Sequence, residues 1–251
     1  GSDRTKLSKR KGAKALTHYR DLGILPEAML NYLAFLGWNP GDERDYLDRT
    51  ALIQEFDLSR VHKGSAIFDE VKLLSVNQHW MRQLSTEKFI ACLDFVNPSS
   101  DEGFTKSLNS EILHKAVPLL KERAHTFTEA REMLSGELAC LFSEPSLNRA
   151  QLVAKESADR PGVTKTSLDS LSEAIQALPG DASSEAVKEA LMPLADAEEV
   201  KGKGGRGAML WPLRYALSGQ ERSPDPFTLI SILGSPEAIS RIRKAIAILE
   251  K

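Results

Sequence analysis

Cysteine is almost absent from this sequence. Among its 251 residues there are two, Cys92 and Cys140, and both lie inside apolar segments without the close spacing of metal ligands. A chain so poor in cysteine is not a disulfide scaffold. We therefore expect two buried free thiols in the reducing cytoplasm, and no metal site.

Aromatic residues are also scarce, at 6% of the chain, and strict apolar–polar alternation is absent. Both features argue against β-strands. No apolar run approaches the roughly 20 residues of a membrane span, and no signal-peptide pattern is present. We expect a cytoplasmic protein without a membrane partner, and a monomer.

The histidines offer no catalytic motif. The sequence also has no fixed repeat that would indicate a repeat architecture. No self-similar period indicates a solenoid. The histidines show no ligand spacing and suggest no catalytic role; they are His18, His62, His79, His114 and His125.

The apolar spacing is helical along nearly the whole chain, which predicts an all-α fold. Pro26 is expected to begin a helix, Thr126 with Glu129 to form a capping box, and Pro118 to kink or break a helix near 108–123. In the last helix, Ile242 lies on the apolar face and Arg241 off it. The later helices are expected at 146–156, 165–178, 183–199, 205–218 and 226–249, the last broken at Gly234.

Charge is balanced overall but not locally. The net charge is −2. The first twenty residues carry Asp3 against seven cations, namely Arg4, Lys6, Lys9, Arg10, Lys11, Lys14 and Arg20. Because RNA binding needs only a local basic stripe, the near-neutral total does not exclude it.

The basic opening contains a short motif with a chemical rationale. In Lys6-Leu7-Ser8-Lys9-Arg10, cations flank a serine, so that charge and close backbone approach could together hold a polyphosphate. Five such residues alone are more typical of a solvated or nuclear-targeting-like basic patch.

The motif resembles the Lys-Met-Ser-Lys-Ser loop of class I aminoacyl-tRNA synthetases, in its Lys-Leu-Ser-Lys-Arg variant. Further landmarks follow in the order seen in bacterial glutamyl-tRNA synthetases. They are Tyr19-Arg20-Asp21-Leu22-Gly23, Asn31-Tyr32-Leu33-Ala34-Phe35-Leu36-Gly37-Trp38, Phe68-Asp69-Glu70-Val71-Lys72-Leu73 and Pro212-Leu213-Arg214-Tyr215-Ala216-Leu217-Ser218-Gly219.

The resemblance implies the C-terminal half of such an enzyme, which would attach glutamate to tRNA(Glu). It places a loop and stem-contact region at 1–84 and two helical anticodon-binding subdomains at 85–143 and 144–251. No strand–glycine-turn–helix unit is evident, so we expect this chain alone to be catalytically inactive and to bind no cofactor. Glutamate, and ATP with Mg²⁺, would be handled by the intact enzyme.

The family pattern also assigns residues. Lys6, Ser8, Lys9 and Arg10 would contact ATP, with Lys6 and Lys9 stabilising the charge of the departing pyrophosphate. Arg123 and Arg214, the latter expected at a helix start, would read anticodon bases. Trp211 replaces another large apolar residue and is expected in the core. Three further cations could contact the tRNA backbone or simply be solvated: Lys201, Lys203 and Arg206.

Three alternatives remain open. The enzyme could also serve tRNA(Gln), although Arg123 favours discrimination. The chain could be a free-standing helical scaffold for a protein partner. It could also be related to glutaminyl-tRNA synthetase, whose usual anticodon module is a β-barrel.

Overall fold

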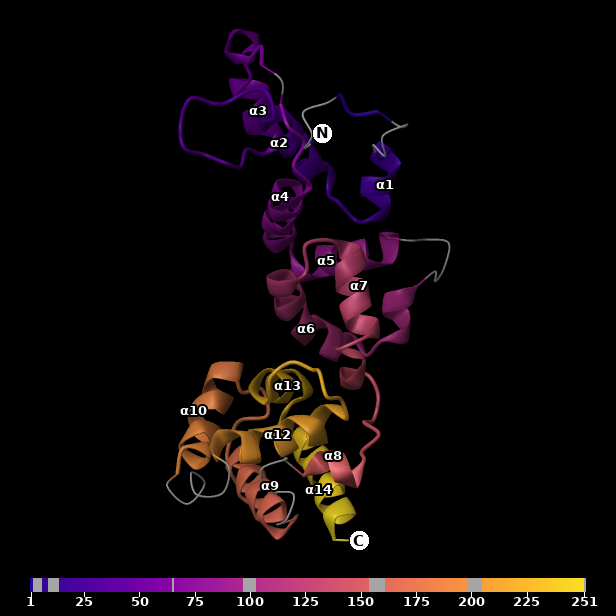
Figure 1. Ribbon diagram of the computed structural model, residues 1–251, viewed down its shortest axis with the longest axis vertical. Helices are drawn as coiled ribbons and strands as arrows, with labels where there is room; N and C mark the ends of the chain where they lie inside the picture. The colour runs from indigo at the N-terminus through magenta and orange to yellow at the C-terminus, as the bar shows by residue number, and fades with distance from the viewer. Residues whose placement is uncertain are drawn as a thin grey trace. The chain divides into compact units, whose positions relative to one another are not determined.

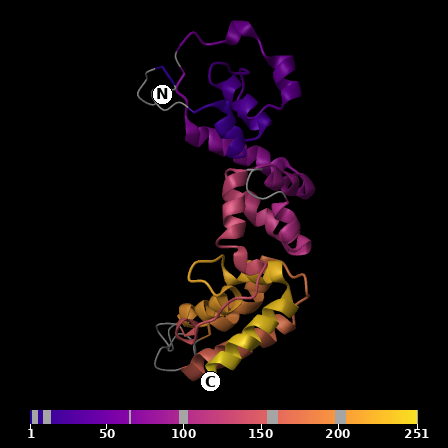
Figure 2. The same cartoon turned by 90° about the vertical axis from the view of Figure 1, so that its right-hand side faces the viewer.

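The structure is a computed structural model that describes residues 1, 6–8, 14–64, 66–96, 103–153, 161–197 and 205–250. The chain divides into two compact units, Gly1–Glu132 and Met133–Lys251. Every regular element of these described ranges is a helix (Figures 1 and 2), which confirms the all-α class. The division falls inside one helix, and the boundaries expected at 84 and 143 stay predictions.

The first unit contains six complete α-helices and the start of a seventh within its described residues. They are α1 (Leu16–Asp21), α2 (Pro26–Phe35), α3 (Arg49–Glu55), α4 (Glu70–Gln83), α5 (Thr86–Phe95), α6 (Ser110–Arg123) and α7 (Phe127–Ser135), with 3-10 turns η2 (Leu58–Arg60) and η3 (Phe104–Ser107).

The centre of this unit is the packing of α2 on α4. Ala28 and Tyr32 of α2 meet Leu73 and Val76 of α4 in one apolar cluster. The Tyr32 hydroxyl accepts a hydrogen bond of 2.6 Å from the backbone N–H of Asp69, directly before α4. The start of α4 is thereby fixed to α2 by apolar burial and by a bond to its cap residue.

A buried amide joins α4 to two chain turns. Asn77 is 0% exposed, and its Oδ1 accepts from Leu25 N at 2.8 Å. Its Nδ2 donates to the carbonyls of Gly23 at 3.3 Å and His125 at 2.7 Å. One side chain therefore satisfies backbone groups from segments before and after α4 in the chain, where burial leaves no water to do so.

The second unit is organised around α12 (Gly205–Ser218), which packs on each of the other elements given below. Its core side chains include Leu213, Tyr215 and Leu217 of α12, all buried. The surrounding elements are η4 (Ala139–Leu141), α8 (Arg149–Leu152), α9 (Pro161–Gln176), α10 (Ser184–Ala195), α13 (Pro226–Leu233) and α14 (Ser235–Leu249).

A buried arginine has the same role here as Asn77 in the first unit. Arg241, on α14, is 3% exposed. Its Nη1 donates to the carbonyls of Cys140 and Leu217, both at 2.7 Å, and its Nη2 to Ser143 at 3.1 Å. Glu237 accepts from its Nε at 2.7 Å. The expectation that Arg241 lies off the buried face is wrong, because these carbonyls supply its partners inside the unit.

Several local predictions are confirmed. Pro26 is the first residue of α2, and the Thr126 hydroxyl accepts from Glu129 N at 3.1 Å at the start of α7. Gly234, at φ 82°, separates α13 from α14. The helix expected at 146–156 is shorter in the described residues, where α8 spans only Arg149–Leu152.

The break expected at Pro118 is absent. α6 continues from Ser110 to Arg123 with Pro118 inside it. A proline within a helix costs about 3 kcal/mol. Burial of Leu113 and Leu120, at 2% and 0% exposure, offsets this, since each buried leucine contributes about 1.5–3 kcal/mol.

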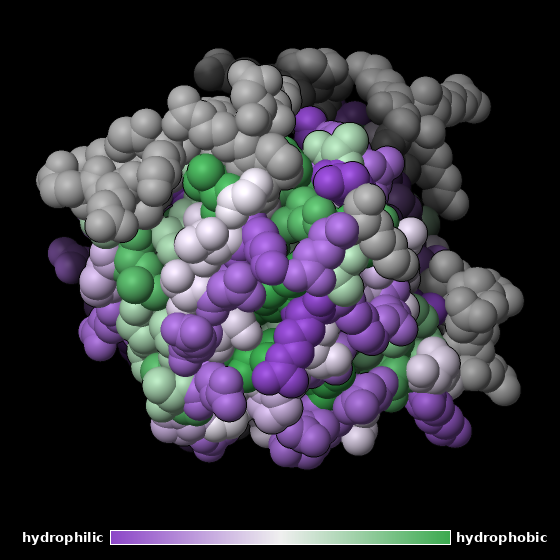
Figure 3. Space-filling model, turned by 90° about the horizontal axis from the view of Figure 1, so that it is seen from below, coloured by the Kyte–Doolittle hydropathy of each residue, from purple (hydrophilic) through white to green (hydrophobic). Residues whose placement is uncertain are grey.

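No helix among the described residues combines the length and apolarity that crossing a membrane requires. The face in Figure 3 is mainly hydrophilic, with smaller apolar areas between the polar side chains. This surface agrees with helices that turn their apolar faces inward.

We predict that Asn77→Ala destabilises the first unit by about 3 kcal/mol, because each stranded buried backbone group costs about 1–3 kcal/mol. Urea unfolding followed by fluorescence measures this, since Trp38 and Trp80 both lie in that unit. The control is Asn39→Ala, at an exposed asparagine whose side chain accepts a local hydrogen bond from Gly41 N. Equal stability of the two variants would contradict the role of Asn77.

We predict that Arg241→Met destabilises the second unit by about 3–5 kcal/mol, the usual cost of removing one side of a buried charged network. Arg243→Met changes an exposed arginine of the same helix and should cost less than about 0.5 kcal/mol. Urea unfolding followed by circular dichroism compares the two variants. A loss of similar size in both would show that the carbonyl contacts of Arg241 do not matter.

Candidate nucleic-acid interface

The described part of the N-terminal motif has no regular secondary structure. Lys6 and Leu7 are exposed, and Ser8 is half-buried. Lys9 and Arg10 lie outside the described residues. The Lys6 ammonium is thus placed where an anionic ligand can reach it, and the expected ATP contacts stay predictions.

The chain just after the motif is tied to the start of α4. The ammonium of Lys14 lies 3.0 Å from a carboxylate oxygen of Glu70, and the Tyr19 hydroxyl donates to the same carboxylate at 3.2 Å. The hydrogen bond from Lys14 is the main reason why the pKa of Glu70 lies below its ordinary value. Burial, together with the charge of Glu70, raises the pKa of Tyr19 to about 12.

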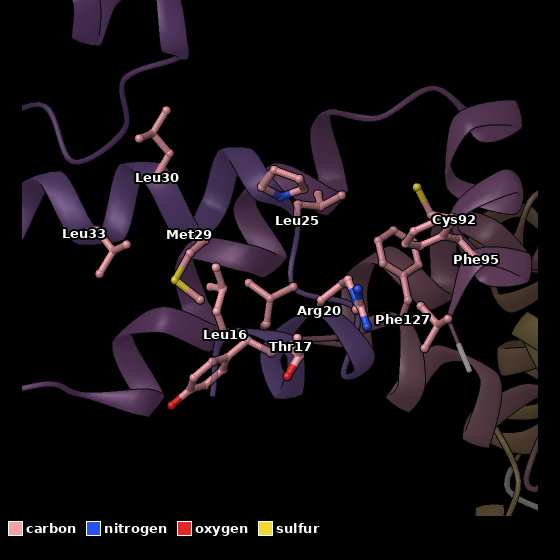
Figure 4. Close-up of a pocket in the computed structure, with 15 residues that line it drawn as sticks. Leu16, Thr17, Arg20, Leu25, Met29, Leu30, Leu33, Cys92, Phe95 and Phe127 are labelled. Carbon is pink, nitrogen blue, oxygen red and sulfur yellow. The ribbon is translucent and has the colours of Figure 1, made fainter. Parts of the chain in front are cut away.

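An apolar pocket that sequence reasoning missed lies in the first unit (Figure 4). Its volume is about 620 Å³, and α1, α2, α5 and Phe127 form its walls. Cys92 is on the lining, where burial raises the pKa of its thiol and disfavours the reactive thiolate. Because the lining is almost wholly apolar, the pocket suits apolar contact rather than acid–base chemistry.

Arg123 is exposed at the last residue of α6. The carbonyls of this helix end are capped by side chains of α4: Gln78 donates to Glu122 O at 2.8 Å, and Arg82 to Lys121 O at 3.1 Å. These donors satisfy backbone carbonyls, which have no intrahelical hydrogen-bond partner at the C-terminal end of an α-helix. The backbone that carries Arg123 is therefore anchored to α4.

Arg214 lies in the second half of α12, so the expected position at a helix start is wrong. Its Nη2 donates to Glu221 O at 2.8 Å and its Nη1 to Ser223 O at 3.3 Å. It is half-buried, and its guanidinium carbon lies 4.7 Å from the ring centre of Trp211. Arg214 thus holds the loop after α12 and places its guanidinium over an aromatic ring at the same time.

Trp211 is half-buried rather than part of the core, contrary to expectation. Its Nε1 donates to the backbone carbonyl of Gln151 at 3.0 Å. The Gln151 amide also accepts from the Tyr215 hydroxyl at 2.6 Å and donates to Glu221 at 3.0 Å. Sequence reasoning missed Gln151 entirely; the spacing of Trp211 and Arg214, three residues apart on one helix, was the available signal for the contact between these two side chains.

Of the three candidate tRNA-backbone cations, only Arg206 belongs to the described residues. Its guanidinium pairs with both carboxylate oxygens of Asp196, and this pairing raises its pKa. A phosphate would have to compete with that carboxylate. Lys201 and Lys203 lie outside the described residues.

Among the described residues, no group of three or more histidine, cysteine or acidic side chains could hold a metal ion. The His79 ring stacks on Tyr46 with centres 3.6 Å apart, and burial lowers its pKa. This environment favours a neutral structural side chain.

Two protein families match the chain in succession. The family described as "tRNA synthetases class I (E and Q), catalytic domain" matches residues 1–75. The family described as "Anticodon binding domain" matches residues 79–246, which is more than half of the chain.

The curated relatives described here are glutamate–tRNA ligases. A glutamate–tRNA ligase 1 from Mesorhizobium japonicum is 36% identical over 251 residues, covering 96% of this chain and 50% of the relative. A glutamate–tRNA ligase from Geobacter sulfurreducens is 34% identical, covering 100% and 50%. The chain thus spans about half the length of these curated relatives and matches their C-terminal half.

A solved structure agrees with these relatives. The crystal structure of a glutamate tRNA ligase from Elizabethkingia meningosepticum, in complex with its amino acid, is similar with a TM-score of 0.68 and 30% identity. The similarity covers 98% of this chain and 49% of that one.

Proposed function

Because the chain belongs to the anticodon binding domain family, we propose that it is the tRNA-reading half of a bacterial-type glutamate–tRNA ligase. Such an enzyme joins glutamate to tRNA(Glu) with ATP. The observation that carries the proposal is the succession of the two matches, a class I catalytic domain over 1–75 and an anticodon binding domain over 79–246.

We divide the work along the chain as follows. Residues 1–84 supply the ATP loop and the stem contacts, and 85–143 and 144–251 form two anticodon-binding subdomains. The chain divides into its compact units between Glu132 and Met133, so the proposed boundary at 143 lies within the second unit. We place the protein in the cytoplasm, as a monomer.

The anticodon contacts rest on Arg123 and Arg214. Anticodon bases are unstacked, so proteins reach their edges and faces with planar guanidinium groups. Arg123 is exposed on a helix end anchored to α4, which suits a contact that must be held in place. Preference for tRNA(Glu) over tRNA(Gln) is assigned to Arg123.

The N-terminal motif serves the chemical step of the whole enzyme. Lys6, Ser8, Lys9 and Arg10 contact the triphosphate of ATP, which arrives with Mg²⁺. Lys6 and Lys9 stabilise the negative charge that develops as pyrophosphate leaves. The exposure of Lys6 is consistent with this role.

A second candidate function is a helical scaffold for a protein partner. The apolar pocket of the first unit favours it, because exposed apolar surface marks interaction sites. A chain that binds a protein through this pocket and binds no tRNA would support the scaffold over the synthetase fragment.

We predict that this chain binds tRNA(Glu) transcripts more tightly than tRNA(Gln) transcripts, and that added salt weakens both complexes. Arg123→Ala should abolish the preference, and Arg214→Ala should weaken binding by about 1–3 kcal/mol, the usual cost of losing a base contact. Equilibrium titration at two salt concentrations measures both effects.

The matched control is Arg243→Ala, because Arg243 is an exposed arginine on α14 outside the proposed contacts. It should bind like the unaltered chain. Equal and weak binding by all four proteins would place tRNA selectivity in the other half of the ligase and would refute both arginine assignments.

We predict that Lys9→Ala in the full-length ligase slows ATP–pyrophosphate exchange by about 100-fold or more, because it removes a group that stabilises transition-state charge. Binding of tRNA should remain nearly unchanged. Lys63→Ala, at an exposed lysine outside the motif, is the control. An exchange rate equal to that of the unaltered enzyme would exclude a role for Lys9.

A further inference from the structure

Large apolar side chains that remain in contact with solvent are concentrated in one stretch of the chain. Among the described residues there are eleven, of which ten lie within residues 1–75 and the other is Phe95. This stretch is the one that matches the class I catalytic domain family. Single exposed apolar residues are normal on a protein surface, but their concentration in one stretch indicates a face that another structure covers.

Four of these eleven side chains also line the apolar pocket of the first unit (Figure 4). They are Leu16 of α1, Leu30 and Leu33 of α2, and Phe95 of α5. Leu16 is 68% exposed and Phe95 is 69% exposed, so each lies partly in the pocket wall and partly in water. A small ligand inside the pocket would leave them in water, whereas a packed chain segment would cover them as well.

The pocket offers little to a charged ligand. The guanidinium of Arg20 already donates to Asp21 at 3.0 and 3.1 Å, and the Tyr19 hydroxyl donates to Glu70 at 3.2 Å. Arg20 is the one charged residue among the described residues that line the pocket. Because RNA binding relies on cations that neutralise phosphates, this lining favours an apolar protein surface over RNA.

The lengths of the relatives indicate where such a protein surface comes from. The chain spans about half the length of the curated relatives and matches their C-terminal half. The pocket is built from both family matches, because α1 and α2 lie within 1–75 and α5 lies within 79–246. In a protein of the relatives' length, the remainder of the catalytic domain is covalently joined to the stretch that carries α1 and α2, and therefore lies within reach of the pocket.

We propose that the pocket and its four exposed apolar residues form the docking surface for the N-terminal half of the ligase, which places apolar side chains there. This proposal rests on the proposed function, because it takes the intact protein to be a glutamate–tRNA ligase. The docking surface is open in this chain and closed in the full-length ligase.

Cys92 provides a native reporter of this docking surface. It is half-buried on the pocket lining, whereas Cys140, the other cysteine, is buried in the second unit. Iodoacetamide should alkylate Cys92 at least about 10-fold more slowly in the full-length ligase than in this chain, because the thiol loses its access to solvent. Mass spectrometry of the two cysteine peptides measures the rates, and Cys140 should react equally slowly in both proteins. Equal rates at Cys92 would overturn the docking surface.

A double variant tests the exposed leucines. Leu30→Gln with Leu33→Gln changes two exposed helical positions, so this chain should keep its urea midpoint. In the full-length ligase the same variant should speed alkylation of Cys92 by about fivefold or more, because burying unpaired amides weakens the contact. Gln83→Ala, at an exposed residue of α4 outside the pocket, is the control and should keep Cys92 protected. Unchanged protection in the double variant would overturn the role of the two leucines.

The remaining outcomes separate this proposal from self-association and from the proposed function. Protection of Cys92 that appears in this chain alone as its concentration rises would assign the surface to a second copy and overturn the proposal. A ligase that activates glutamate and binds tRNA normally with Cys92 unprotected would overturn the docking surface and leave the proposed function standing. A full-length protein that protects Cys92 but has neither activity would support the docking surface and refute the proposed function.

Discussion

Each unit depends on satisfying backbone groups that its own packing removes from water. Asn77 does this in the first unit and Arg241 in the second, each through one side chain that bonds to segments far apart in the sequence. Apolar burial supplies most of the driving force, but it does not distinguish one arrangement of helices from another. The directional bonds of these two residues set which chain segments meet.

The candidate contact residues lie on helices that hydrogen bonds of this kind hold in place. Arg123 ends a helix whose last carbonyls are capped by α4, the helix that carries Asn77. Arg214 lies three residues before Leu217, whose carbonyl accepts from Arg241. Neither arginine sits on an isolated flexible loop. Side chains on anchored helices lose less conformational freedom on binding, which favours selective recognition.

Sequence reasoning was most successful where the signal is local. Helix starts at Pro26 and after Thr126, and the break at Gly234, follow from residue chemistry within one turn. It failed where distant segments decide. Arg241 is buried because the carbonyls of Cys140 and Ser143 meet it, and no periodicity in α14 reveals them. Trp211 was assigned to the core because it stands where the family has another large apolar residue, and its bond to Gln151 becomes apparent only in the folded unit.

Asn77 has a consequence for how the chain tolerates genetic change. Its oxygen must accept from Leu25 while its nitrogen donates to two carbonyls, so an isosteric aspartate would bring a buried carboxylate up to carbonyl oxygens. Glutamine would add a methylene at a fully buried position, and such overpacking is destabilising. A single-nucleotide error at this codon would therefore be more harmful than at most surface codons, although the residue touches no proposed ligand.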